Sequence, residues 1–206
     1  MSLVGSLLGL ASDVKARVEQ MRWDRRWARC RALGMHIGND VCLPASTWVD
    51  STHCYLISIG DHCGFGDGCI ILSHDAQMDE FLDAARVGRV TIHPSCHIGA
   101  RTVILAGVEI GPRTIVGANS VVSKTLPPNT VCAGNPAKVI CSIDEYLEKH
   151  RARIQNSPKF DFSTHGIANI SPKDRAEVME ATRTGSAYVL GGRTAELQGG
   201  GDTRRT

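Results

Sequence analysis

Aromatic side chains are scarce in this sequence: Phe, Trp and Tyr together make up 5% of its 206 residues. Glycine, in contrast, occurs 21 times. This composition disfavours an ordinary β-sandwich or helical core and indicates a repetitive backbone with many tight turns. The formal net charge of +2 provides no strong field of either sign, so we expect no nucleic-acid partner.

The sequence also lacks the patterns of secreted and membrane proteins. Its eight cysteines include no CxxC pair. The first residues, MSLVGSLLGLAS, carry no positively charged side chain and form an apolar run too short to span a bilayer. We therefore expect a cytoplasmic protein whose cysteines act as small buried apolar residues in a reducing compartment, without a metal site.

A period of six residues runs through the middle of the chain. Over 92–122 an aliphatic residue recurs at every sixth position, and the fourth residue after it is small or β-branched. The aliphatic positions are Ile92, Ile98, Ile104, Ile110, Val116 and Val122. An earlier block follows the same period at Ile37, Leu43 and Val49 and, after a slip, at Ile59, Phe65 and Ile71. Cys63 and Cys69 occupy the small fourth position, which explains their spacing.

A period of six fits neither an α-helix nor a simple alternating strand. It fits short strands joined by tight corners, with three hexads closing one triangular coil and successive coils stacked about 4.8 Å apart. The aliphatic residues would fill the interior of the prism, and glycines would relieve the backbone at its corners. Chance recurrence in a β-rich chain is the alternative. Two further columns count against it: the small fourth residue, and the glycine that often follows the aliphatic residue, as at Gly99, Gly111 and Gly117. The sequence therefore predicts an all-β solenoid, a parallel β-helix of hexapeptide repeats.

The segments that flank the repeats are predicted to be helical. We divide the chain into an N-terminal helical cap at 1–34, a β-helix domain at 35–140 with an excursion loop at 74–90, and a C-terminal helical extension at 141–206 whose tail is disordered. An apolar stripe and a cluster of arginines mark the cap helix. We expect it to cover the open end of the prism; a weak contact with an anionic membrane surface is the alternative. The extension should contain helices over 142–154 and from Ser171 onward.

The run IVGANSVVSKTLPPNTVCAGNPAKVI at 115–140 resembles the end of the maltose and galactoside O-acetyltransferases and of the serine acetyltransferases. These are hexapeptide-repeat acyltransferases, a family that also includes polysaccharide O-acetyltransferases, and the resemblance covers about 37–140. It implies a left-handed coil, a homotrimer with active sites between subunits, and acetyl-CoA as co-substrate. The slip after Val49 and the gap from His74 to Arg89 depart from the family's regular repeat.

The gap in the repeat begins at His74, and in the resembled family the catalytic histidine stands near such a place. A neutral imidazole can take the proton from an acceptor hydroxyl as its oxygen attacks a thioester, so we expect His74 to be the general base. Candidate ligands for acceptor hydroxyls are the acids Asp50, Asp75 and Asp79, with Glu80 and Asp83 in the same loop. We expect Asp75, as the neighbour of His74 in an extended segment, to point to the opposite face.

The remaining histidines carry no comparable signal. His93 and His97 raise the alternative of a γ-carbonic anhydrase, a class with the same fold and three zinc-bound histidines. Their spacing of four across a corner and the acyltransferase-like run at 115–140 count against it.

The coenzyme site is implied by the resemblance. Ala100 and Ala118 fall where family members offer backbone groups to the pantetheine arm, and Ser123 and Lys124 fall at a matching polar–basic pair. Lys138 falls where a basic residue meets the nucleotide, which suits the phosphate charges of CoA. Cys141 stands where some sugar acetyltransferases have a further arginine.

Together these features predict an acetyl-CoA-dependent O-acetyltransferase that acts on a hydroxyl of a sugar or polysaccharide precursor. Two rival enzymatic functions are N-acetylation of an amino sugar and acetylation of an antibiotic. A catalytically silent trimeric β-helix that serves as a scaffold is the non-enzymatic alternative.

Overall fold

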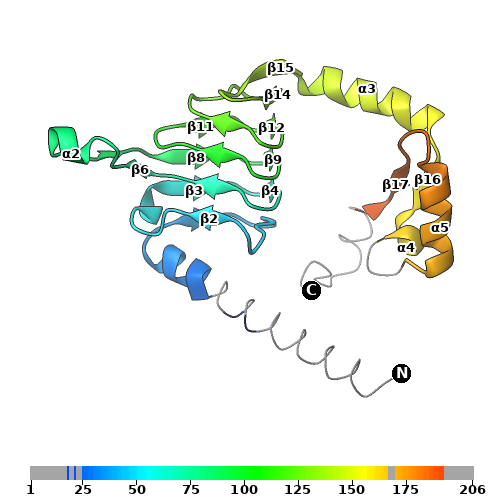
Figure 1. Ribbon diagram of the computed structural model, residues 1–206, viewed down its shortest axis with the longest axis horizontal. Helices are drawn as coiled ribbons and strands as arrows, with labels where there is room; N and C mark the ends of the chain where they lie inside the picture. The colour runs from blue at the N-terminus through cyan, green and yellow to red at the C-terminus, as the bar shows by residue number, and fades with distance from the viewer. Residues whose placement is uncertain (1–17, 19–20, 22–24, 167–169, 193–206) are drawn as a thin grey trace. The chain divides into compact units, whose positions relative to one another are not determined.

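The computed structural model describes residues 18, 21, 25–166 and 170–192 (Figure 1). Contacts along the chain divide it into two units, one ending at Tyr146 and the other beginning at Leu147. The division of the sequence at 34 and 140 stays a prediction.

The first unit is a stack of short strands that visit three sheets in rotation (Figure 1). One sheet has the order β1 (His36–Ile37), β3 (Ile57–Ile59), β8 (Val90–Ile92) and β11 (Glu109–Ile110). The second has β2 (Trp48–Val49), β5 (Ile70–Ile71), β10 (Val103–Ile104) and β13 (Val121–Val122). The third has β4 (Gly64–Phe65), β9 (His97–Ile98), β12 (Ile115–Val116), β14 (Thr130–Ala133) and β15 (Lys138–Ser142).

Neighbouring strands in these sheets are parallel and lie one coil apart, except that β15 returns antiparallel to β14. Ile92 on β8 pairs with Ile110 on β11, which is three hexads later in the sequence. The hexapeptide period therefore gives a parallel β-helix, as predicted. The hand of the coil stays the expectation drawn from the resemblance.

The interior of the prism is made by the two predicted columns. The aliphatic positions from Val49 to Val122 are almost fully buried, with Ile71, Ile104 and Ile110 at 0% exposure. The small fourth positions are buried beside them, and their hydroxyl and thiol groups donate to carbonyl groups at the corners. Ser120 Oγ donates to Gly117 O at 2.6 Å, and Cys96 Sγ donates to Gly111 O at 3.0 Å.

All eight cysteines are free thiols. Six of them are buried, namely Cys30, Cys54, Cys63, Cys69, Cys96 and Cys132.

The corners require glycine where successive coils come close. A Cβ atom at Gly99 would stand 2.4 Å from the backbone nitrogen of Ala118 on the next coil. No side chain can be accommodated at that distance without a backbone shift, so this glycine fixes the spacing of the coils.

Both departures from the six-residue period leave the stack at the same place. Val49 on β2 pairs with Ile71 on β5, so these strand ends are adjacent. After β2 the chain forms an irregular turn with the short 3₁₀ helix η1 (Cys54–Leu56). After β5 it forms the excursion, an antiparallel pair of β6 (His74–Asp75) and β7 (Arg86–Val87) with α2 (Asp79–Leu82) between them. Figure 1 shows this hairpin projecting from the side of the stack.

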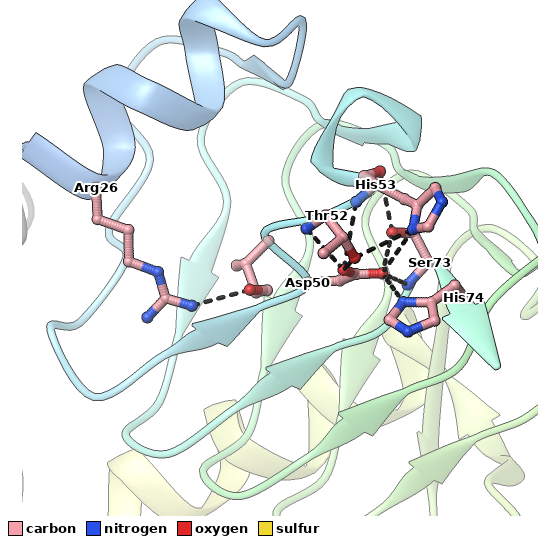
Figure 2. A network of polar contacts seen from close by, with 7 residues as sticks. Arg26, Asp50, Thr52, His53, Ser73 and His74 are labelled. Atoms are coloured by element: carbon pink, nitrogen blue, oxygen red, sulfur yellow. Dashed lines mark hydrogen bonds and ion pairs between the residues drawn. The ribbon is translucent and has the colours of Figure 1, made fainter. Parts of the chain in front are cut away.

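The described part of the N-terminal cap packs on the first coil. Residues 25–32 are helical; Cys30 is buried, and Trp27 packs against the core. Arg26 Nη2 donates to Val49 O at 2.9 Å (Figure 2). Much of the N-terminal helical cap predicted at 1–34, including Arg22 and Trp23, lies outside the described residues. None of the described helices is long and apolar enough to cross a membrane.

The second unit contains a small mixed arrangement of helices and strands. Helix α3 (Ile143–Asn156) crosses the division between the units, and its first turn is closed by Ser142, whose Oγ accepts from Glu145 N. It is followed by β16 (Lys159–Asp161), α4 (Phe162–His165), α5 (Pro172–Ala181) and β17 (Tyr188–Leu190). Ser171 and Asp174 form a capping box at the start of α5. The tail predicted to be disordered lies outside the described residues.

The aliphatic column should carry much of the stability of the stack. Replacing Ile104, which has 0% exposure on β10, by alanine should lower the free energy of unfolding by about 2–5 kcal/mol, because the surrounding coils cannot close the cavity. Ile115→Ala is the matched control, since Ile115 is the half-buried neighbour of the column on β12. Denaturant unfolding measures both, and equal losses would contradict the assignment of the core.

Candidate active site

A buried carboxylate organises the place where the two departures meet. Asp50 follows directly after β2 and is only 1% exposed. Its backbone nitrogen donates to Ile71 O, so the ladder between β2 and β5 holds it beside the end of β5. Figure 2 shows Ser73 and His74 on the facing side and Thr52 and His53 in the turn that follows Asp50.

Each oxygen of the Asp50 carboxylate accepts several hydrogen bonds. Oδ1 accepts from Thr52 Oγ1 at 2.6 Å, from Thr52 N at 3.0 Å and from His53 N at 3.3 Å. Oδ2 accepts from Ser73 Oγ at 2.8 Å, from Ser73 N at 3.3 Å and from His74 Nδ1. The two oxygens are thus fully engaged by this chain.

These bonds decide the charge of Asp50. Burial alone would raise the pKa of its carboxyl group, because a charge is poorly solvated there. The hydrogen bonds from His74, Thr52 and Ser73 stabilise the ionised form and outweigh burial, so the pKa lies well below its ordinary value. Asp50 is therefore an anion at neutral pH.

The anion fixes the tautomer and orientation of His74. An ionised carboxylate can only accept, so His74 Nδ1 must carry the proton of their hydrogen bond. In the neutral ring Nε2 then holds the lone pair. Figure 2 shows Nε2 on the side of the ring away from Asp50, and the side chain is 31% exposed. An imidazole held in this way can accept a proton from a bound molecule, as a general base does.

The three acids expected near the acceptor occupy different positions. Asp50 is buried and bonds to His74, so its position does not fit a direct contact with an acceptor. Asp75 lies opposite Arg86 in the antiparallel backbone ladder of β6 and β7. Its Oδ1 accepts from Gln77 N at 3.0 Å, within its own turn. Asp79 is exposed at the start of α2. Only Asp50 is brought to His74 by a described contact.

The residues expected to bind the coenzyme lie at two corners of the prism. Ala100 and Ala118 follow β9 and β12, and Asn119 N donates to Ala100 O at 2.9 Å, so they occupy the same corner on successive coils. Lys138 lies near the same corner. It is paired with Ala133 in the ladder of β14 and β15, and a Cβ atom at Gly117, the residue before Ala118, would contact the Cβ of Ala133.

Ser123 and Lys124 stand at another corner. They follow β13, in the same sheet as β5, and both are exposed. Lys124 and His74 are thus at the same end of one sheet, two coils apart, which corresponds to about 10 Å along the stack.

Three residues of this site carry no expectation from the sequence: Thr52, His53 and Ser73. The available signal is indirect. The slip after Val49 and the break after Ile71 mark two irregular turns, and a parallel β-helix can stack such turns on one another. His53 is tied to the site by its backbone, since its amide nitrogen donates to Asp50 Oδ1 at 3.3 Å. Its ring centroid lies 5.1 Å from that of His74.

The described residues include two groups of side chains whose ligand atoms are close enough for a metal ion: Asp50, His53 and His74, and separately His165, Asp174 and Glu177. The first belongs to the network above, in which hydrogen bonds already engage the carboxylate. His93 and His97, which suggested a carbonic anhydrase, belong to neither group, and His93 Nε2 bonds to Glu109.

Comparisons with known proteins agree with the repeat. The model of the family described as bacterial transferase hexapeptide (six repeats) matches residues 89–124. WcaF of Escherichia coli (strain K12), provisionally named a colanic acid biosynthesis acetyltransferase, is 33% identical, and the match covers 53% of this chain and 70% of WcaF. The galactoside O-acetyltransferase of the same strain is 44% identical over 30% of each chain.

Among solved structures, the acetyltransferase VCA0836 of Vibrio cholerae, complexed with acetyl-CoA, is 24% identical with a TM-score of 0.48, and the match covers 64% of this chain and 89% of that one. The family match and the extent of the similarity to WcaF carry the assignment. The chain therefore belongs to the bacterial transferase hexapeptide family and is an acyltransferase.

Proposed function

We propose that this protein transfers the acetyl group of acetyl-CoA to a hydroxyl of a sugar or polysaccharide precursor, with His74 as the general base. The observation that carries the proposal is the orientation of His74 by the buried, ionised Asp50, which leaves Nε2 as the proton acceptor of a part-exposed ring.

His74 moves one proton twice in this reaction. Nε2 takes the proton from the acceptor hydroxyl as the hydroxyl oxygen attacks the carbonyl carbon of the thioester. The new C–O bond forms, the C–S bond breaks, and the imidazolium returns the proton to the departing CoA sulfur. The products are the acetyl ester and free CoA, and the ring is neutral again.

Asp50 acts through His74 and does not touch the acceptor. Its hydrogen bond keeps the proton on Nδ1, so that the lone pair is on the nitrogen that faces the acceptor. Its negative charge stabilises the imidazolium that forms during the attack. The bonds from Thr52 and Ser73 hold the carboxylate in place and keep it ionised.

We assign the coenzyme to the corners described above. Ala100 and Ala118 would lie beside the pantetheine arm, where small side chains permit a close approach. Ser123, Lys124 and Lys138 are exposed, and the lysines would meet the phosphate groups of CoA. This part of the proposal rests on the sequence run at 115–140 and on family membership.

The choice of a sugar hydroxyl is supported by the relatives, one of which is named a galactoside O-acetyltransferase. We also propose a homotrimer. His74 stands on one side of the prism and is part-exposed, and a flat side of a stack cannot enclose a substrate without a second wall.

The assignment of His74 predicts a specific kinetic change. His74→Ala should lower kcat by about 10²–10⁴-fold, because general-base catalysis is lost, and should leave the affinity for acetyl-CoA nearly unchanged. Release of CoA thiol with a panel of sugars measures kcat, and calorimetry measures coenzyme binding.

His97→Ala is the matched control, because His97 is an exposed histidine on β9, in a different sheet. It should keep near-normal turnover. Equal losses in the two variants, or a normal kcat in His74→Ala, would show that another group is the base.

The two lysines should affect the coenzyme alone. Lys124→Ala and Lys138→Ala should each raise the KM for acetyl-CoA by about fivefold or more, because a charge-assisted phosphate contact is lost. The KM for the acceptor should change little. Lys149→Ala, in α3, is the control for loss of a positive charge elsewhere. A change confined to the acceptor KM would contradict the coenzyme assignment.

A further inference from the structure

His53 is the part of the network that the reaction above leaves unused. The hydrogen-bond pattern assigns its protons as strictly as those of His74. Thr52 Oγ1 has a single hydrogen, and it donates this hydrogen to the ionised Asp50 at 2.6 Å. The 3.1 Å contact between Thr52 Oγ1 and His53 Nδ1 must then have the imidazole as donor. In the neutral ring of His53, Nδ1 carries the proton and Nε2 holds a lone pair.

The site therefore presents two imidazoles with the same tautomer. Both rings direct their protonated Nδ1 towards the network around Asp50, and both are 31% exposed. Their centroids are 5.1 Å apart and their planes are inclined at 43° (Figure 2). The site thus offers two hydrogen-bond acceptors, the Nε2 atoms of two neighbouring, part-exposed rings.

His53 is also held as firmly as a positioning residue requires. Its backbone nitrogen donates to Asp50 Oδ1 and its ring Nδ1 donates to Thr52 Oγ1, so the backbone and the ring are both tied to the site. The ring of Tyr55 is also close to that of His53, with centroids 5.9 Å apart. A ring fixed in this way loses little freedom when a ligand binds.

We propose that His53 positions the acceptor and that the acceptor is a vicinal diol. His74 Nε2 takes the proton from the hydroxyl that is acetylated, while His53 Nε2 accepts a hydrogen bond from the neighbouring hydroxyl. Two hydrogen bonds of about 2.8 Å and the short separation of adjacent hydroxyls can span rings 5.1 Å apart. A ligand with one hydroxyl, or with an ether beside it, would leave the His53 acceptor unsatisfied. This inference rests on the proposed acetyl transfer and narrows its substrate class.

The test compares three small acceptors with wild type and two variants. The acceptors are cis-1,2-cyclohexanediol, its monomethyl ether and cyclohexanol, and release of CoA from saturating acetyl-CoA is followed. The ether keeps the second oxygen but removes its hydrogen, so it isolates the proposed contact. In the wild type, kcat/KM per hydroxyl should be at least tenfold higher for the diol than for the ether. His53→Leu should reduce this ratio to about one.

A conservative variant separates positioning from a merely structural role. His53→Gln places an amide oxygen near the position of Nε2 and should restore part of the diol preference, whereas a structural role would make both variants equally defective. A ratio near one in the wild type, or an unchanged ratio in His53→Leu, overturns the proposal. So does loss of the preference on treatment with EDTA, which would mean that a metal ion bound by the two histidines and Asp50 holds the diol.

A second measurement keeps this inference distinct from the proposed function. Nitrogen-15 NMR of the full chain reports the tautomer of His53 without any turnover, and the inference requires protonated Nδ1 and an Nε2 signal that shifts with the diol but not with the ether. The opposite tautomer overturns it whatever the activity. Absence of CoA release from every acceptor, with the NMR shift present, would instead overturn acetyl transfer and leave the diol site standing.

Discussion

Removing the carboxylate of Asp50 from water costs free energy that only a full set of hydrogen-bond donors can offset. The protein supplies these donors from two adjacent turns, and one of the donors is the imidazole of His74. The hydrogen bonds that this buried carboxylate requires therefore keep Asp50 ionised and set the tautomer of His74. They also hold Thr52, His53 and Ser73 in place. The catalytic and acceptor-binding proposals both follow from that single requirement.

The β-helix makes such a requirement possible to meet. Its coils are fixed by close backbone contacts such as that of Gly99 with Ala118 and by a continuous aliphatic column. Side chains at strand ends therefore stand in defined places. Irregular turns can leave this frame without disturbing it, and two of them leave from paired strands, β2 and β5. Residues 24 positions apart in the sequence, Asp50 and His74, are brought into contact in this way.

The sequence predicts the fold well, because the six-residue period states directly which residues lie inside and which lie one coil apart. The break in the period, together with the family resemblance, also points to His74, whose role as the base stays a prediction. The sequence does not reveal the role of Asp50, because the slip after Val49 leaves the pairing of β2 with β5 undetermined until the coils are built. The sequence gives no sign of a role for His53. Its tautomer follows from the hydrogen bonds of Thr52 with Asp50 and with His53, which are known only from the structure. The coenzyme positions rest on resemblance, and they stay predictions.

The measurement that tests this account most directly is the turnover of Asp50→Asn beside that of Asp75→Asn, with the unfolding transition of each variant recorded alongside. An amide at position 50 keeps the shape of the carboxylate but cannot hold the His74 proton on Nδ1 or stabilise the imidazolium. We expect Asp50→Asn to remain folded and to lose about 10²-fold or more in kcat at nearly unchanged acetyl-CoA affinity, and Asp75→Asn to stay within a few-fold of wild type. Normal turnover in folded Asp50→Asn, or an equal loss in Asp75→Asn, would contradict the account.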